Sequence, residues 1–151
     1  MAHIFEQAFF LVAIFFGMKS GFYQGDPQKI FEDIDELKPT VMLTVPRILN
    51  RIYSKVQDDV SKKGVFSRWL FHKGLSAKDY YLKHQGAFTH NLYDKLIFDK
   101  VKAKFGGRLR VLVTGSAPIS PEIMSFFKIA LSIHVYDLYG QTEAAIVTVT
   151  N

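Results

Sequence analysis

Apolar and polar positions along this 151-residue chain switch repeatedly between the period of a helix and that of a strand. The segment from about Ile4 to Phe16 predicts a helix buried in a large core, with Gly17 at its end. A second helix is expected to begin with Asp26 as its N-cap and Pro27 at its first helical position. A third helix follows Pro46 and carries its apolar residues on one side.

Three short apolar runs between the helices have the character of strands covered on both faces. They are residues 41–45, 110–114 and 133–138. The last two flank a loop and a helix that begins at Ser120, whose hydroxyl is a favourable cap. Such a strand–helix–strand unit gives parallel neighbouring strands. The pattern therefore predicts an α/β fold, a layered and mostly parallel sheet flanked by helices, in one domain over residues 1–151.

Aromatic residues make up 15% of the chain and are frequent in its middle, residues 65–105. This region is predicted to be mostly helical, with breaks at Gly74 and Gly86. Large aromatic side chains fill thick cores or line apolar tunnels, and composition leaves both readings open.

Charge and composition exclude several classes of protein. Hydrophobic residues at 48% and charged residues at 22% are typical of a globular protein and not of a disordered one. The absence of cysteine excludes disulfides and thiolate metal sites. The formal charge of +5 favours anionic partners such as nucleotides or a lipid surface, but no Lys/Arg-rich block or helix–turn–helix pattern supports binding to nucleic acid.

The apolar run Ala8–Gly17 could be mistaken for a targeting segment. It is shorter than the roughly 20 residues of a membrane-spanning helix. It also lacks the basic flank and the cleavage site of a signal peptide, so no signal peptide is predicted in this chain.

Candidate chemistry gathers where two predicted strands end. Ligands of open parallel sheets bind beyond the carboxyl ends of the strands, and the stretches GSAP and YGQTE both leave such ends. In the first, Gly115 lets the backbone approach a flat group, and Ala117-Pro118 forms a small rigid wall.

In the second stretch, three side chains suit a nucleotide. Tyr139 can stack on an aromatic base, Thr142 can donate a hydrogen bond to a phosphate oxygen, and Glu143 can hold Mg²⁺ together with phosphate. The same residues also allow an ordinary reading, in which the glycines form turns, Tyr139 belongs to the core and Glu143 is a solvated charge. The spacing alone leaves both readings open.

The two stretches together resemble the adenylate-forming acyl-activating enzymes. VLVTGSAPISPEI followed by VYDLYGQTE is similar to that family and, within it, to the long-chain fatty acyl-CoA synthetases. GFYQGDPQKIFEDIDELKPTVMLTVPRILNRIY matches the long-chain branch, and AHIFEQ resembles the segment after the family's phosphate loop. The resemblance spans nearly the whole chain, and the ordered set of motifs is specific.

The resemblance implies a role for each matching position. Tyr139 would stack on adenine, with the backbone of Gly115-Ser116-Ala117 along the base, and Thr142 and Glu143 would contact the α-phosphate region and Mg²⁺ as the catalytic pair. The nucleotide-binding set also includes Pro118, Gly140 and Gln141.

On the acyl side, His3 matches a position near the acyl and phosphate groups, and the turn Thr44-Val45-Pro46 would lie near the acyl pocket. Leu138 departs from the pattern, because many relatives have glycine there. A side chain intruding at this position would disturb the placement of the base.

The implied reaction joins a fatty acid to ATP, with Mg²⁺, and then transfers the acyl group to coenzyme A. The family's phosphate loop should precede His3, and its ribose-binding aspartate, hinge and catalytic lysine should follow Asn151. We therefore expect a partial AMP-binding domain without a second domain, an internal slice of the large N-terminal domain that is inactive alone.

The partners implied for the whole enzyme are fatty acid, ATP and coenzyme A, with no nucleic acid. Its expected location is intracellular, either cytoplasmic or at a membrane such as the surface of the endoplasmic reticulum, mitochondria or peroxisomes, with peripheral membrane association of the full-length protein left open. In the isolated chain, apolar side chains at residues 8–16 and in the last strand are expected to be exposed because the neighbours that would cover them in a longer domain are missing, causing poor solubility or self-association.

Two other functions stay open from the sequence. One is a non-catalytic nucleotide-binding or interaction module derived from the same family. The other is a generic nucleotide-binding α/β protein such as a methyltransferase, which the lack of a G-x-G-x-x-G fingerprint disfavours.

Three further constellations have less support. Ser116, His134 and Asp137 are not expected to form a triad, because Ser116 is not in a G-x-S-x-G elbow and the other two point to opposite faces of a strand. The five histidines lack metal-ligand spacing. A basic run could be a solvated face or a phosphate or membrane contact; its members are Lys100, Lys102, Lys104, Arg108 and Arg110.

Overall fold

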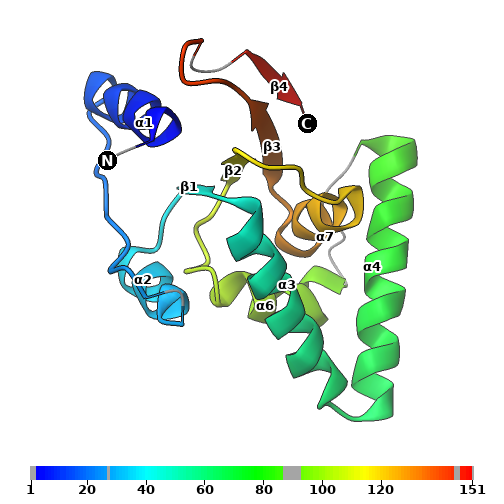
Figure 1. The fold of residues 1–151 in the computed structure, drawn as a ribbon. Coiled ribbons are helices and arrows are strands. Elements are labelled where there is room, and N and C mark those ends of the chain that lie inside the picture. Colours follow the sequence, from blue (N-terminus) through cyan, green and yellow to red (C-terminus); the bar gives the residue numbers. More distant parts are fainter. Residues whose placement is uncertain (1–2, 27, 87–92, 145–146, 151) are drawn as a thin grey trace.

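Three parallel strands form the centre of the fold, and a short antiparallel strand extends one edge (Figure 1). A computed structural model describes residues 3–26, 28–86, 93–144 and 147–150. The strands, in their order across the sheet, are β1 (Val41–Thr44), β2 (Val111–Gly115), β3 (His134–Tyr139) and β4 (Thr148–Thr150). The mostly parallel, layered α/β prediction is therefore confirmed.

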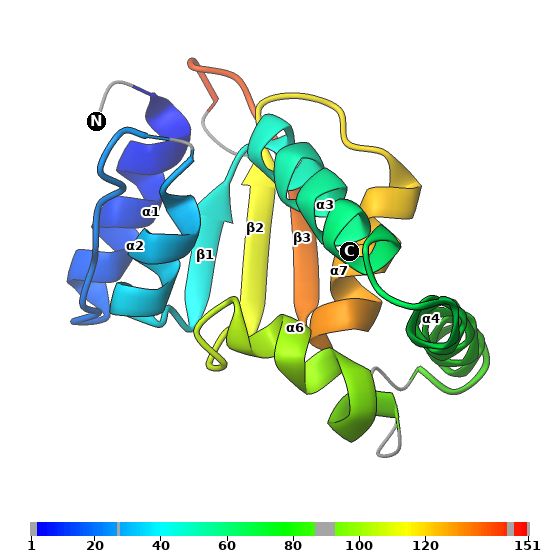
Figure 2. The ribbon, with the colours of Figure 1, turned by 90° about the horizontal axis from the view of Figure 1, so that it is seen from below.

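Helices alternate with the strands along the chain. They are α1 (Ile4–Phe15), α2 (Ile30–Leu37), α3 (Pro46–Ser61), α4 (Val65–Gln85), the π-helical turn η1 (Asp94–Phe98), α6 (Asp99–Ala103) and α7 (Pro121–Leu131). Figure 2 shows β1, β2 and β3 side by side, with α1 and α2 beyond the β1 edge and α4 on the far side of α3 and α7.

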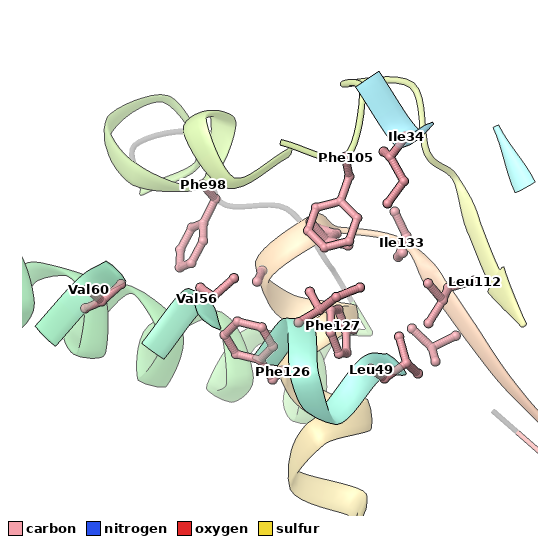
Figure 3. Packing of buried hydrophobic residues seen from close by; sticks show 14 of the residues in the cluster. Ile34, Leu49, Val56, Val60, Phe98, Phe105, Leu112, Phe126, Phe127 and Ile133 are labelled. Carbon is pink, nitrogen blue, oxygen red and sulfur yellow. The ribbon is translucent and has the colours of Figure 1, made fainter. Parts of the chain in front are cut away.

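The core lies between one face of the sheet and the helices α3 and α7 (Figure 3). Leu112 of β2 and Val135 of β3 pair in register on this face, and both are fully buried. Phe127 of α7 packs edge-on against Phe105 with ring centroids 6.2 Å apart, and against Phe126 at 5.3 Å. The core thus fixes α7 and α3 against the sheet by aromatic and aliphatic packing.

Prolines start the two helices that cover the sheet. Pro46 and Pro121 occupy first-turn positions of α3 and α7, where the missing N–H costs nothing. The Ser120 hydroxyl accepts a hydrogen bond from the Glu122 N–H at 3.2 Å, which confirms the predicted cap. Tyr53, in the middle of α3, donates to the Glu122 carboxylate at 3.0 Å, so the start of α7 is also linked to the body of α3.

The first helix exists, but the prediction that it is buried was wrong. Of the α1 side chains, Ala13 is the buried one, whereas Leu11, Ile14 and Phe15 are exposed. The reason is that α1 lies beside the sheet edge and no layer of described residues covers its outer side (Figure 1). The predicted exposure of apolar residues at 8–16 is confirmed for most of that segment, whereas in the last predicted strand Ile133, Val135 and Leu138 are buried, so the prediction was wrong there. Within the described ranges, no helix is both long and apolar enough to cross a membrane.

The second helix begins later than predicted. α2 starts at Ile30, and Asp26 instead accepts a hydrogen bond from the Gln28 N–H at 2.8 Å in the preceding turn. The short Asp side chain satisfies the nearby backbone in a turn, and this competes with a role as a helix cap. The predicted position of Pro27 lies outside the described residues.

Two expectations about local structure also need correction. Gly74 does not break α4, because the helix runs through it and the rings of Phe98 and Tyr93 pack where its side chain would be. Gly86 does end the helix, in the left-handed conformation with φ of 65°. Val41 and Leu43 of β1 are exposed, so this edge strand is covered on one face and not on both as predicted.

A buried ion pair joins α4 to η1 and α7. The Lys78 ammonium is almost fully buried and donates to the Asp94 carboxylate at 2.6 Å and to the Ser132 hydroxyl at 2.8 Å. Its charge also lies over the Phe98 ring, 4.7 Å from the centroid. Burial lowers the pKa of Lys78, and the hydrogen bond and charge of Asp94 oppose that shift. Asp94 therefore keeps an otherwise costly buried charge in place.

We expect Asp94→Ala to lower the free energy of unfolding by about 3–5 kcal/mol, because it leaves the Lys78 ammonium buried without its carboxylate. Urea denaturation followed by far-UV circular dichroism measures this. The matched control is Asp79→Ala, which removes the partner of Lys83 in an exposed i,i+4 pair and should cost no more than about 0.5 kcal/mol. Equal losses of unfolding free energy in the two variants would show that the buried pair stabilises the fold no more than the exposed pair does.

Candidate functional site

The ends of three parallel strands meet at one edge of the sheet. Thr44 of β1 pairs with Thr114 of β2, and Thr114 pairs with Asp137 of β3. The segments that follow these strands therefore start side by side: residues 44–46, 115–118 and 139–143. The expected convergence of GSAP and YGQTE is confirmed, and β2 and β3 are direct neighbours.

The backbone at the end of β2 passes very close to β3. A side chain on Gly115 would place its Cβ 2.7 Å from the Leu138 carbonyl oxygen, so only glycine fits without displacing a strand. Ser116 then adopts φ of +72°, a left-handed conformation that is uncommon for a residue with a side chain. Together these two residues turn the chain sharply out of the sheet, and Ser116, Ala117 and Pro118 are all exposed.

The segment after β3 presents polar groups to solvent. The Tyr139 ring is 58% exposed, and its hydroxyl accepts a hydrogen bond from the Gln141 side-chain amide at 3.1 Å. The Tyr139 carbonyl accepts from the Val147 N–H at 2.8 Å, which holds the strand end in place. The ring is therefore positioned but uncovered, so the reading of Tyr139 as a core residue is wrong.

Thr142 and Glu143 follow on the same exposed segment. Within the described residues, no hydrogen bond or ion pair engages the Glu143 carboxylate. Both side chains are thus available to a ligand at this edge. Gly140, between them and Tyr139, is exposed as well.

The Leu138 side chain is 7% exposed. It lies on the same face as Gly115, packed within the sheet, and Tyr139 is the residue that emerges at the strand end. The leucine that stands here in place of the family's usual glycine therefore packs its side chain within the sheet and does not enter the exposed loop.

The acyl-side candidates are only partly brought together. Thr44 and Pro46 are buried and Val45 is exposed, at the edge shared with Gly115. His3 caps α1, where its Nδ1 accepts from the Phe5 N–H at 3.2 Å. Figure 2 shows the amino-terminal end of α1 on the side where β1 and β2 end, but within the described residues no hydrogen bond or ion pair joins the His3 side chain to the strand ends.

A polar row at the strand ends, buried at its two threonines, was missed by sequence reasoning. Thr44, Thr114 and Asp137 lie in register on the helix-covered face, one row beyond Leu112 and Val135. The Thr114 hydroxyl is fully buried and has no hydrogen-bond partner among the described residues. Burial also raises the pKa of Asp137, against a smaller lowering by the Leu138 backbone. A polar residue at the end of each predicted apolar run, or one position before it, was the available signal.

The weaker constellations do not form sites. Ser116 and Asp137 lie near the strand ends, but His134 pairs with Val111 at the opposite end of the sheet, so no triad is assembled. In the part of the chain that the structure describes, no group of three or more His, Cys, Asp or Glu could hold a metal ion. In the basic run, Lys102 pairs with the buried Asp94 at 3.3 Å and Lys104 with Asp59 at 2.5 Å, whereas Lys100, Arg108 and Arg110 are exposed.

Comparison with known proteins agrees with this geometry. The family described as AMP-binding enzyme matches residues 1–151. The long chain acyl-CoA synthetase 6, peroxisomal, of Arabidopsis thaliana is 39% identical over 147 residues, which are 97% of this chain and 21% of that protein. The human long-chain-fatty-acid–CoA ligase 1 is 38% identical over 143 residues, 95% of this chain and 20% of that protein. The chain thus spans about a fifth of the length of the curated relatives it matches.

Solved structures with the same fold are adenylation domains. The adenylation domain of a carboxylate reductase from Mycobacterium chelonae has a TM-score of 0.60 and 27% identity, covering 83% of this chain and 17% of that one. The A-PCP didomain of carboxylic acid reductase from Segniliparus rugosus, in complex with AMP, has a TM-score of 0.54 and 30% identity, covering 80% of this chain and 14% of that one.

We expect Gly115→Ser to destabilise the fold by about 1–3 kcal/mol, because its Cβ meets the Leu138 carbonyl and forces β2 and β3 apart. Chemical denaturation measures the change. Gly64→Ser is the matched control: no atom lies within 4 Å of the added Cβ, and serine is favoured at the N-cap of α4. A Gly115→Ser protein as stable as the control would contradict the close approach.

The raised pKa of Asp137 predicts a pH dependence of stability. The folded state binds the proton more tightly than the unfolded state, so the free energy of unfolding should rise as pH falls through the folded pKa toward the ordinary value of 3.8. Asp137→Asn should remove this contribution and stabilise the protein at neutral pH. Thermal unfolding from pH 4 to 7 compares the two proteins, and parallel pH profiles would contradict the assignment.

Proposed function

Since this chain belongs to the AMP-binding enzyme family, we propose that it provides the adenine and phosphate side of the adenylation site in a long-chain fatty acid–CoA ligase. The observation that carries the proposal is the arrangement of two adjacent parallel strands. Their ends place the tight Gly115 turn beside the exposed Tyr139 ring. A flat aromatic base needs both a close backbone wall and a stacking face, and this edge offers both.

In this proposal each exposed group has one task. The adenine base stacks on Tyr139, whose ring is held from its hydroxyl by Gln141. The backbone of Gly115-Ser116-Ala117, with Pro118, lines the edge of the base, and Gly140 keeps the segment free of a side chain next to it. Base stacking on an aromatic residue is worth about 1–3 kcal/mol in nucleic-acid complexes, enough to fix the orientation of the nucleotide.

Thr142 and Glu143 then act on the phosphates. The Thr142 hydroxyl donates a hydrogen bond in the α-phosphate region. Glu143 is one free carboxylate, and Mg²⁺ commonly takes one or two carboxylates together with phosphate oxygens and water, so the residue suits a metal that arrives with ATP. When bound, Mg²⁺ offsets the negative charge on the phosphates. These two residues orient the phosphates for attack by the substrate carboxylate.

The proposed substrate is a long-chain fatty acid, which reacts with ATP to give the acyl-adenylate and pyrophosphate. Coenzyme A then displaces AMP to form the thioester. The turn Thr44-Val45-Pro46, next to Gly115 at the strand ends, faces the acyl pocket, and His3 approaches the acyl and phosphate groups. The chain is part of the AMP-binding domain of an intracellular enzyme. The relatives are about five times its length, and in this proposal the corresponding parts of a longer protein supply the remaining groups of the active site.

The test uses the protein encoded by the complete reading frame that contains this sequence. We expect Tyr139→Ala to reduce fatty-acid-dependent ATP–pyrophosphate exchange by about 5- to 150-fold, mostly through a higher KM for ATP, because a stacking contact of about 1–3 kcal/mol is lost. Tyr80→Ala is the control, because Tyr80 on α4 is also 58% exposed. If the two variants behave alike, the stacking role is wrong.

Two further arms separate catalysis from simple nucleotide binding. Glu143→Gln should lower the exchange rate and weaken its dependence on Mg²⁺, whereas Glu36→Gln, on an exposed residue of α2, should not. The 151-residue chain alone is expected to show no exchange above background. A complete protein that binds ATP but performs no exchange with any long-chain fatty acid would favour a non-catalytic nucleotide-binding module.

A further inference from the structure

Helices α3 and α4 form a hairpin whose turn projects away from the sheet (Figure 1). α3 begins at Pro46, beside the strand ends, and its 16 residues carry the chain roughly 24 Å away from them. The turn and the first two turns of α4, residues 61–73, are called the hairpin tip here. It lies at the far end of α3 from the proposed nucleotide edge.

The hairpin tip exposes large apolar side chains. Val65, Phe66 and Trp69 are 75%, 72% and 54% exposed. Phe66 and Trp69 stack on each other with ring centroids 6.1 Å apart, so the aromatic surface is continuous. An open hollow of about 400 Å³ lies next to it, lined in part by Val60, Val65 and Trp69. Exposed side chains of this size in one place mark an interaction surface.

Basic side chains surround this aromatic surface. Lys62 and Lys63 form the turn, Arg68 lines the hollow, and Lys73 lies over the Trp69 ring at 6.0 Å. From residue 60 to residue 78 the sequence contains no acidic residue. Of the acidic residues just before the tip, Asp59 is paired with Lys104, and Asp58 is exposed at the end of α3. The tip therefore has a positive charge around an apolar centre.

We propose that the hairpin tip docks on an anionic lipid bilayer. Trp69 and Phe66 insert at the boundary between headgroups and acyl chains, where amphipathic aromatic rings are favoured, and the basic residues contact lipid phosphates. Each Lys or Arg near an anionic surface strengthens the attraction to it. The proposal is independent of the nucleotide site, which faces away from the bilayer because it lies at the other end of α3.

The charge distribution favours the hairpin tip over α1, the other exposed apolar surface, as the place where a bilayer docks. Helix α1 exposes more apolar side chains. However, residues 3–18, the segment that contains this helix, include the acidic Glu6 and no Lys or Arg. That helix offers nothing to an anionic headgroup. The hairpin tip combines both requirements in one short segment.

Trp69 is the single tryptophan of this chain, so its fluorescence reports on the tip alone. The purified 151-residue chain is mixed with phosphatidylcholine vesicles, with or without phosphatidylserine. We expect a blue shift of the emission and quenching by lipids brominated on their acyl chains, both requiring phosphatidylserine and both weakened by salt. Vesicle binding without quenching of Trp69 would place the contact elsewhere, for example on α1, and would overturn the proposal. Absence of binding would do the same.

Charge reversal supplies the second test. Lys62→Glu with Lys63→Glu should weaken binding to anionic vesicles at least about tenfold. Lys19→Glu with Lys29→Glu changes the net charge equally at exposed positions between α1 and α2, which lie beyond the β1 edge of the sheet (Figure 2), and should have a much smaller effect. Far-UV circular dichroism confirms that both double variants are folded. Equal effects of the two pairs would show non-specific attraction and reject the hairpin tip as the docking surface.

The same two pairs are then compared by vesicle co-sedimentation in the protein of the complete reading frame. If the tip docks on lipid there, the Lys62/Lys63 pair again has the larger effect. If a further segment of that protein covers the tip, reversal of Lys62 and Lys63 leaves vesicle binding unchanged, and the surface is a protein contact instead.

Discussion

The close approach of β2 and β3 at Gly115 determines where this molecule can bind a ligand. Gly115 has no side chain, so the Leu138 carbonyl can occupy the space that a side chain would fill. The two strands therefore stay paired up to Gly115, the last residue of β2. The chain must then leave the sheet abruptly, and Ser116 adopts a positive φ to do so. The loop is displaced to one side, and the Tyr139 ring at the neighbouring strand end stays open to solvent. A wider separation of the strands would allow an ordinary turn and would remove the narrow wall beside the ring.

The remainder of the fold holds these two strand ends at fixed positions. α7 connects them, and its Phe127 packs against the helix-covered side of the sheet (Figure 3). The buried Lys78 and Asp94 attach α4 to the C-terminal end of α7 through Ser132. A buried charge pair is tolerated only when both partners are present and well hydrogen-bonded, so loss of either partner would destabilise this junction of α4, η1 and α7.

Sequence reasoning located the three parallel strands, the starts of α3 and α7 and the convergence of GSAP with YGQTE, because these depend on local rules. Pro121 after a capping Ser120 begins a helix in almost any context, and parallel strands must end at a common edge. The burial of α1 could not be read in the same way, since apolar residues show that a surface needs a partner but not which residues supply it. The Lys78–Asp94 pair and the polar row of Thr44, Thr114 and Asp137 are contacts between distant segments that leave no periodic signal.

The order of the strands also has a consequence for how the chain folds. β2 and β3 are separated by little more than one helix, whereas the paired residues Val41 and Val111 of β1 and β2 are about 70 positions apart. Closing the shorter loop costs less conformational entropy, so the β2–α7–β3 unit can form before β1 joins it. The loops that carry Gly115 and Tyr139 belong to this local unit. The nucleotide side of the site can therefore assemble early, and the turn at Thr44 completes the edge only when the slowest pairing of the sheet has formed.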